Sequence, residues 1–182
     1  MSAVMHVLLS AFEFVLTAVM AVGVVYVNYV LSIRTNADYN AEEELKKQNM
    51  GVAILLAAML FASGLIVKSG IYPAVSMVRL AVASHEAYLP IWQVALIGLA
   101  HIPLVFCVAI FTISLSLRFY GRLTTGIDEG AELKKGNPAV GVVLAAVVIV
   151  VGMYVSDGVS ALTKSLIPQP SLGSVSTVKV MH

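Results

Sequence analysis

Two ionisable side chains, Glu13 and His101, stand in otherwise apolar stretches of this sequence, 88 positions apart (101 − 13). Lys68 and Asp157 stand close to the ends of two other apolar stretches. Imidazole changes its charge near neutral pH, so these four residues are candidates for a proton- or ion-responsive site. The alternative is structural: Glu13 with Lys68, and His101 with Asp157, would form ion pairs that hold neighbouring helices together.

These candidates need helices to position them, and the composition indicates that the helices cross a membrane. Hydrophobic residues make up 59% of the 182 residues and charged residues only 12%, which is outside the balance of soluble domains. A bilayer requires about 20 mostly apolar residues per helical span. Four stretches satisfy this requirement: residues 4–33, 50–71, 90–117 and 138–160.

We therefore expect an all-α fold, an integral membrane four-helix bundle, that occupies residues 1–167 as one domain. Residues 168–182 contain prolines and small polar residues and are expected to form a flexible tail. Net charge is only +1, which argues against nucleic-acid binding.

The distribution of Lys and Arg predicts the orientation of the chain. Seven of the eleven basic residues lie in or beside the connections after the first and third spans: Arg34, Lys46, Lys47, Arg118, Arg122, Lys134 and Lys135. Loops rich in Lys and Arg stay in the cytoplasm, so these two connections should be cytoplasmic and both termini should lie outside the cytoplasm. We expect a multi-pass protein of the bacterial inner (plasma) membrane.

A duplication is visible at a fixed offset of 88 residues. The stretch "ELKKQN" begins at Glu44 and "ELKKGN" begins at Glu132, and the same offset relates Glu13 to His101. The units span about residues 8–70 and 96–159, with two apolar stretches in each. An even number of spans gives both units the same direction, so the sequence predicts two parallel two-helix repeats.

The repeated charged motif is the most complex polar sequence in the chain. Its candidate residues are Glu44, Lys46, Lys47, Asn49, Asp128, Glu132, Lys134, Lys135 and Asn137. Asn49 and Asn137 directly precede apolar runs, where an asparagine can accept a hydrogen bond from the first helical turn, and Pro138 suits the first helical position. The motif is thus either a capped helix entrance with lysines paired to acids, or a docking surface for a cytoplasmic partner or lipid head groups.

This pattern of an acidic residue, a spacer and E-L-K-K-x-N before an Ala- and Gly-rich apolar run resembles an uncharacterised bacterial inner-membrane family, domain of unknown function 350. The resemblance covers both units as tandem copies, with "EELKKQNMGVAI" and "DEGAELKKGNPAVGV" as its most specific pieces. In the first copy Asn40 stands where the second has Asp128. The resemblance implies a multi-pass membrane protein and supplies no established activity.

Several further features predict helix packing. Small residues at four-residue spacing in the second and fourth spans, such as Ala53/Ala57 and Gly141/Ala145, favour close contact between these helices or a homo-oligomer seam. Asn28 in the first span and Ser114 and Ser116 in the third are candidates for hydrogen bonding between helices. Pro103 should kink the third span.

The outer border of the membrane is predicted from aromatic residues. Tyr72, Tyr88 and Trp92 fit an aromatic belt. Between Tyr72 and Tyr88, alternating apolar and polar residues favour a short helix that lies on the membrane, with a re-entrant segment as the alternative.

Catalytic signatures such as G-x-S-x-G, a P-loop, H-E-x-x-H or a cysteine cluster are missing from the sequence, so we expect no enzyme, no catalytic residues, no cofactor and no metal site. Two function classes remain. The first is a membrane interaction or scaffold component, in contact with the lipid bilayer and a cytoplasmic protein partner or a homo-oligomer. The second is a small channel-like or transporter-like permeation protein that uses the polar residues of the first and third spans.

Overall fold

The computed structural model describes residues 3–34, 40–83 and 90–166, and the predicted tail over 168–182 lies outside these ranges. The described chain is helical, as expected. Four long helices, α1 (Ala3–Arg34), α3 (Met50–Ala83), α4 (Ile91–Leu123) and α6 (Pro138–Leu166), are joined with two short ones, α2 (Ala41–Lys46) and α5 (Glu129–Lys134).

Each long helix contains an apolar segment long enough to cross a bilayer. These segments are Val7–Val30, Met50–Ile71, Ala100–Leu123 and Pro138–Ser165. Three of them agree closely with the expected spans. The third is shifted toward the C-terminus relative to the predicted 90–117, because α4 continues without a break to Leu123. Pro103 lies inside α4, which runs through it.

The expected surface helix between Tyr72 and Tyr88 is a wrong prediction. Helix α3 continues from the apolar segment, which ends at Ile71, through to Ala83. A helix needs to be apolar only where it meets lipid, and α3 continues through Pro73 despite the low helix propensity of proline. Tyr88 and the side chain of Tyr72 are outside the described part, whereas Trp92 is exposed.

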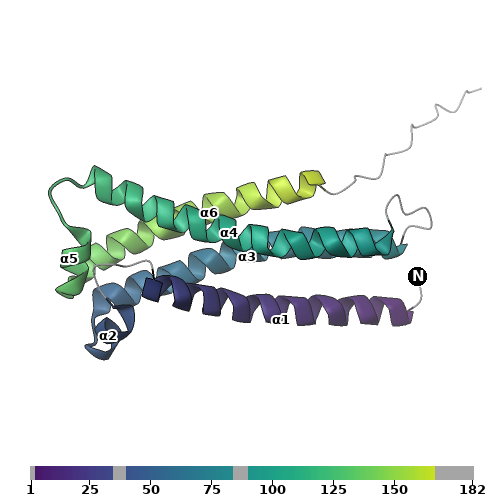
Figure 1. The fold of residues 1–182 in the computed structure, drawn as a ribbon, viewed down its shortest axis with the longest axis horizontal. Coiled ribbons are helices and arrows are strands. Elements are labelled where there is room, and N and C mark those ends of the chain that lie inside the picture. Colours follow the sequence, from purple (N-terminus) through teal and green to yellow (C-terminus); the bar gives the residue numbers. More distant parts are fainter. Residues whose placement is uncertain (1–2, 35–39, 84–89, 167–182) are drawn as a thin grey trace, which may run out of the picture.

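The four long helices run in alternating directions, so α2 and α5 lie at the same end of the bundle (Figure 1). Corresponding elements of the two halves start 88 residues apart: α2 and α5 at Ala41 and Glu129, and α3 and α6 at Met50 and Pro138. This correspondence supports the predicted pair of parallel repeats.

Helix α3 is the centre of the bundle and packs most extensively against α6, which confirms the expected contact between the second and fourth spans. Small residues permit the close approach. A Cβ on Gly152 would stand 2.6 Å from the Cβ of Ala62, and one on Gly141 would collide with the backbone of Gly51. In membranes such backbone proximity supplies the van der Waals contact that holds helices together.

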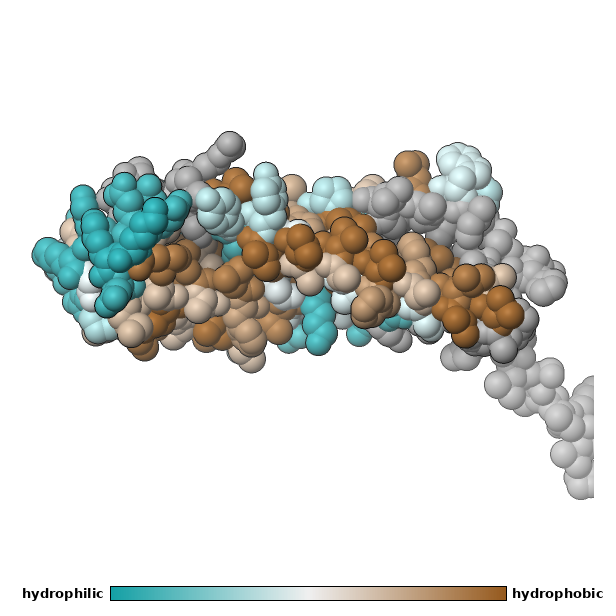
Figure 2. Space-filling model, turned by 90° about the horizontal axis from the view of Figure 1, so that it is seen from below, coloured by the Kyte–Doolittle hydropathy of each residue, from teal (hydrophilic) through white to brown (hydrophobic). Residues whose placement is uncertain are grey.

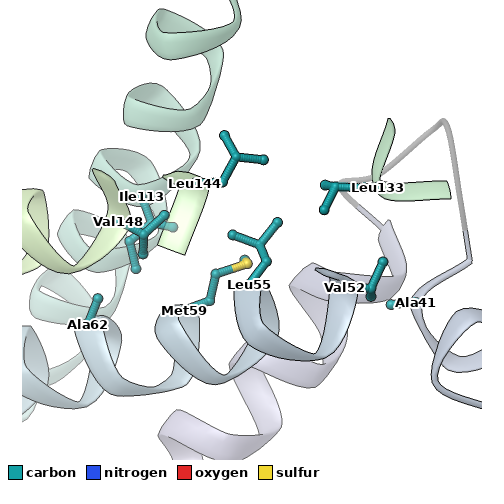
Figure 3. Packing of buried hydrophobic residues seen from close by; sticks show 9 residues of the cluster. All are labelled: Ala41, Val52, Leu55, Met59, Ala62, Ile113, Leu133, Leu144 and Val148. Atoms are coloured by element: carbon teal, nitrogen blue, oxygen red, sulfur yellow. The ribbon is translucent and has the colours of Figure 1, made fainter. Parts of the chain in front are cut away.

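Two clusters of buried apolar side chains form the core. One reaches Ala41 and Leu133 of the two short helices and includes Leu55, Met59, Ile113 and Val148 (Figure 3). The other lies farther along the bundle, where Met20 of α1, Ile66 of α3 and Val105 of α4 meet. On the face drawn in Figure 2, hydrophilic residues are densest at one end of the molecule and the flanks are mainly apolar.

Candidate functional site

The hydrophilic end is built from residues 40–49 and 128–137, which we call the charged end. Its two short helices begin alike. The Asn40 side chain accepts a hydrogen bond from the Glu42 amide, and the Asp128 side chain accepts one from the Ala131 amide. Asn and Asp are both effective N-caps, so the difference between the copies at this position preserves the local structure.

In the first copy a carboxylate organises the turn between α2 and α3. Glu44, which is buried, accepts hydrogen bonds from Lys47 Nζ at 2.9 Å and from Asn49 Nδ2 at 2.8 Å. The Asn49 side-chain oxygen accepts a hydrogen bond from the Val52 amide at 3.1 Å. The asparagine thus caps α3, as its position before the apolar run predicts, and also orients Glu44.

The second copy repeats this network. Glu132 accepts from Lys135 Nζ at 2.7 Å and from Asn137 Nδ2 at 2.8 Å. The Asn137 oxygen accepts from the Ala139 amide at 3.1 Å, and α6 begins at Pro138, as expected. The repeated charged sequence therefore encodes a repeated fold of the helix entrance.

A left-handed residue completes each turn. Gln48 has a φ of 60° and its positional counterpart Gly136 has a φ of 83°. Glycine adopts this conformation without steric cost, whereas Gln48 holds it at some expense. The backbone bonds around it are the same in both copies: Gln48 N to Leu45 O at 3.0 Å and Gly136 N to Leu133 O at 2.9 Å.

Hydrogen bonding also sets the ionisation of the charged end. The Asn49 amide, followed by Lys47, lowers the pKa of Glu44, and the Asn137 amide, followed by Lys135, lowers the pKa of Glu132. The bond to Glu44 in turn raises the pKa of Lys47, and the bond to Glu132 raises that of Lys135. Each network therefore holds a fixed pair of opposite charges at neutral pH.

One hydrogen bond joins the two copies. Asn49 Nδ2 donates to the carbonyl oxygen of Leu133 at 2.6 Å, and both residues are buried. A Cβ on Gly51 would stand 2.6 Å from the carbonyl oxygen of Asn137, so the backbones are also in contact here. The two charged motifs consequently form one surface.

Other charged groups of this end point outward. Lys46 is exposed and pairs with the exposed Glu42 at 3.0 Å, an arrangement that contributes little to stability. Glu43 and Lys134 are also exposed. These groups, unlike Glu44 and Glu132, are available to a binding partner.

The intramembrane candidates are not brought together as expected. The ion pairs among the described side chains lie at the charged end, and neither Glu13 with Lys68 nor His101 with Asp157 is one of them. The His101 ring lies 3.2 Å from the Thr163 hydroxyl of α6, whereas Lys68 and Asp157 are exposed. The long side chain of Lys68 can reach water from the end of its span, which removes its need for a partner.

The space beside His101 is small. A cavity of about 10 Å³ lies between His101 and apolar residues that include Met20, Val67 and Val105. This volume is close to the minimum for a single water molecule. Within one chain, it provides no room for a hydrated ion.

Asn28 forms a hydrogen bond between helices, as predicted. It is buried in α1 and its side-chain nitrogen donates to the Ser63 hydroxyl of α3 at 2.5 Å. Ser116 instead donates to Ile113 O in its own helix. Ser63 and Thr163 were missed from the sequence because isolated hydroxyl residues in apolar helices give no sign of the direction in which they point.

The described residues contain no cluster of potential metal ligands. In residues 3–34, 40–83 and 90–166, no three His, Cys, Asp or Glu side chains lie close enough to hold an ion.

Four apolar helices of membrane-spanning length, with charged residues gathered at one end, define a multi-pass membrane protein. Within that class, the family described as "Domain of Unknown Function (DUF350)" matches residues 4–159 and 92–177 in two overlapping copies, and the chain belongs to this family. Comparisons with curated proteins and with solved structures give no match.

Proposed function

We propose that the protein is a non-enzymatic scaffold of the bacterial inner membrane whose charged end binds a protein in the cytoplasm. The observation that carries this proposal is the fusion of two copies of one charged motif into a single surface through Asn49 and Leu133. The placement of seven of eleven basic residues on this side supports a cytoplasmic orientation.

The internal hydrogen bonds favour a recognition role for the remaining charges. Because Glu44 and Glu132 are held by Asn49 and Asn137, the short helices are fixed before a partner arrives. A pre-organised surface loses less entropy on binding than a flexible loop. The exposed groups are then presented in a constant geometry.

The charge balance favours a protein over lipid head groups. This side of the chain, residues 34–49 and 118–137, contains seven acidic and seven basic side chains, so it has no excess of positive charge (7 − 7). The cytoplasmic leaflet is itself anionic, so it attracts basic rather than acidic segments. A protein surface with charges of both signs can complement this pattern.

The test uses a carboxyl-reactive cross-linker on native membranes, followed by mass spectrometry of the linked peptides. The binding variant combines Lys46→Gln with Lys134→Gln, which removes two exposed charges and leaves both Glu–Asn networks intact. The matched control combines Lys68→Gln with Lys164→Gln, the same change of charge at exposed positions away from the charged end.

We expect a cytoplasmic protein linked to carboxylates of residues 42–44 or 128–132 in the wild type and in the control, and lost from the binding variant. Links only between copies of this chain, or a partner retained at the wild-type level by the binding variant, would contradict the proposal.

A further inference from the structure

The two halves of the chain contact each other through different faces, although their sequences correspond. Helix α3 presents Leu55 and Ala62 to the interface, whereas the second half receives them with Ile113, Leu133 and Val148 (Figure 3). In a two-fold symmetric contact, each residue and its counterpart 88 positions away would be buried together. The burial of these counterparts shows which kind of contact is present.

The face that α3 uses is left open on α6. Ala62 has 0% of its surface exposed, while its counterpart Val150 has 52%. Leu55 is 3% exposed and its counterpart Val143 is 44% exposed. Helix α3 in the first half is buried against the second half through this face. The corresponding face of α6 in the second half is exposed.

The reverse holds for the receiving face. Ile113 is 1% exposed, while its counterpart Val25 is 59% exposed. Leu133 is buried, while its counterpart Leu45 is exposed. The first half therefore carries a free copy of the receiving surface, and the contact within the chain is of the head-to-tail type.

Both free surfaces are hollowed. A groove of about 400 Å³ in the first half is lined by Val25, Leu45, Leu56 and Leu60, among others. Their counterparts are the core residues Ile113, Leu133, Leu144 and Val148. A second groove of about 270 Å³ is lined by residues that include Asn137, Val140 and Val143, the counterparts of Asn49, Val52 and Leu55.

We propose that copies of this chain associate head to tail by repeating, between chains, the contact that joins the two halves within a chain. The α4–α6 side of one copy packs into the α1–α3 groove of the next. The occupant of each groove is thereby a second copy of this chain. Such an interface generates a closed ring or an open row rather than an isolated two-fold dimer. It reaches into the charged end at Leu45 and Asn137, and it requires no cytoplasmic partner.

The proposal extends to a specific hydrogen bond. The Asn49 side-chain amide donates one hydrogen to Glu44 and the other to Leu133 O. Its counterpart Asn137 donates to Glu132 and lines the second groove, while Leu45 lines the first. In the head-to-tail contact, Asn137 Nδ2 of one copy donates to the Leu45 carbonyl oxygen of the next.

The contact between chains is expected to be looser than the contact within a chain. Gly141 lies directly against the backbone of Gly51, and there is no room for a Cβ at Gly141. The counterparts of these glycines are Ala53 and Ala139. The two additional methyl groups must separate the helices at this level, so association is weaker than intramolecular packing and reversible in detergent.

The experiment is disulfide cross-linking between two differently tagged chains in native membranes, in a Cys107→Ser background that removes the single natural cysteine. Within a chain, Val105 Cγ2 would lie 2.6 Å from a Cβ on Gly70. The counterparts are Thr17 and Gly158, so one chain carries Thr17→Cys and the other Gly158→Cys. Both positions are exposed, and nothing lies within 4 Å of a Cβ on Gly158, so both substitutions should preserve the fold.

We expect a mixed disulfide between the two tags on oxidation, and a ladder of multiples of the chain mass when both cysteines are in one chain. The matched control pairs Val19→Cys with Ser156→Cys, two residues away along each helix, because their counterparts Cys107 and Lys68 are exposed within the chain. Links between identical positions would indicate a symmetric dimer, and links no more frequent than in the control would indicate faces covered by lipid. Either result would overturn the proposal.

Discussion

Asn49 donates a 2.6 Å hydrogen bond to the carbonyl oxygen of Leu133, whereas the bond recorded from the side-chain nitrogen of its counterpart Asn137 goes to Glu132 within its own motif. The two copies are thus alike in local structure and unequal in packing. This inequality gives matched pairs of substitutions in which one variant serves as the control for the other.

Replacing Asn49 with alanine should destabilise the protein more than replacing Asn137. Both variants lose a helix cap and a bond to a glutamate, but only Asn49→Ala leaves the buried Leu133 oxygen without its partner from α3. The additional loss should be about 1 kcal/mol. Thermal unfolding in detergent, under conditions where gel filtration gives a monomer, measures the difference, and equal melting temperatures would contradict this assignment.

Substitution by valine should lower the stability of the chain at Gly152 and leave it unchanged at Gly64. Gly152→Val drives a side chain into Ala62 and should cost about 1–3 kcal/mol. A Cβ on Gly64 meets nothing within 4 Å in the chain, so Gly64→Val should leave the melting temperature of the monomer close to wild type. Since Gly64 faces Val150 of the neighbouring copy in the head-to-tail contact, Gly64→Val should reduce the Thr17→Cys to Gly158→Cys cross-link. A Gly64→Val variant with an unchanged cross-link yield would argue against this contact.

Acidification should weaken the charged end. The pKa values of Glu44 and Glu132 are lowered by their hydrogen bonds from Asn49 and Asn137, so the folded form holds a proton less tightly than the unfolded chain. Their contribution to stability is therefore complete at neutral pH and is lost as the pH falls through the folded-state pKa. We expect the melting temperature of the wild type to fall more between neutral and acidic pH than that of Glu44→Gln with Glu132→Gln. Equal decreases of the melting temperature in the wild type and the double variant would show that other groups control stability at acidic pH.

The bond between Asn28 and Ser63 should be detectable as coupling between α1 and α3. A double-mutant cycle with Asn28→Ala and Ser63→Ala should give a coupling free energy of about 0.6 kcal/mol, the average for such bonds in membranes. The readout is the free energy of unfolding in mixed micelles. If the two substitutions change the free energy of unfolding additively, this hydrogen bond does not stabilise the packing of α1 against α3.

The sequence predicts the helices well because a bilayer imposes a length and composition on every span. It also predicts the caps at Asn49 and Asn137 and the ion pairs of Lys47 and Lys135, since these are contacts within a few residues. The 88-residue offset correctly relates the start of α2 to that of α5 and the start of α3 to that of α6.

Contacts between helices were predicted less well. Glu13 with Lys68, and His101 with Asp157, were matched by depth alone, and depth says nothing of the direction in which a side chain leaves its helix. His101 instead meets Thr163, and Asn28 meets Ser63. The extension of α3 to Ala83 was missed because its polar residues suggested a boundary, although helix formation does not require an apolar surface.

The proposed function requires that the charged end, which is folded from both copies of the motif, faces the cytoplasm. Single cysteines at Lys46, Lys134 and Lys164, each in the Cys107→Ser background, test this with a thiol reagent that cannot cross membranes. We predict labelling of Lys164→Cys in intact spheroplasts and labelling of Lys46→Cys and Lys134→Cys only after the membrane is opened. Labelling of Lys46→Cys and Lys134→Cys from opposite sides, or of both in intact spheroplasts, would contradict the account.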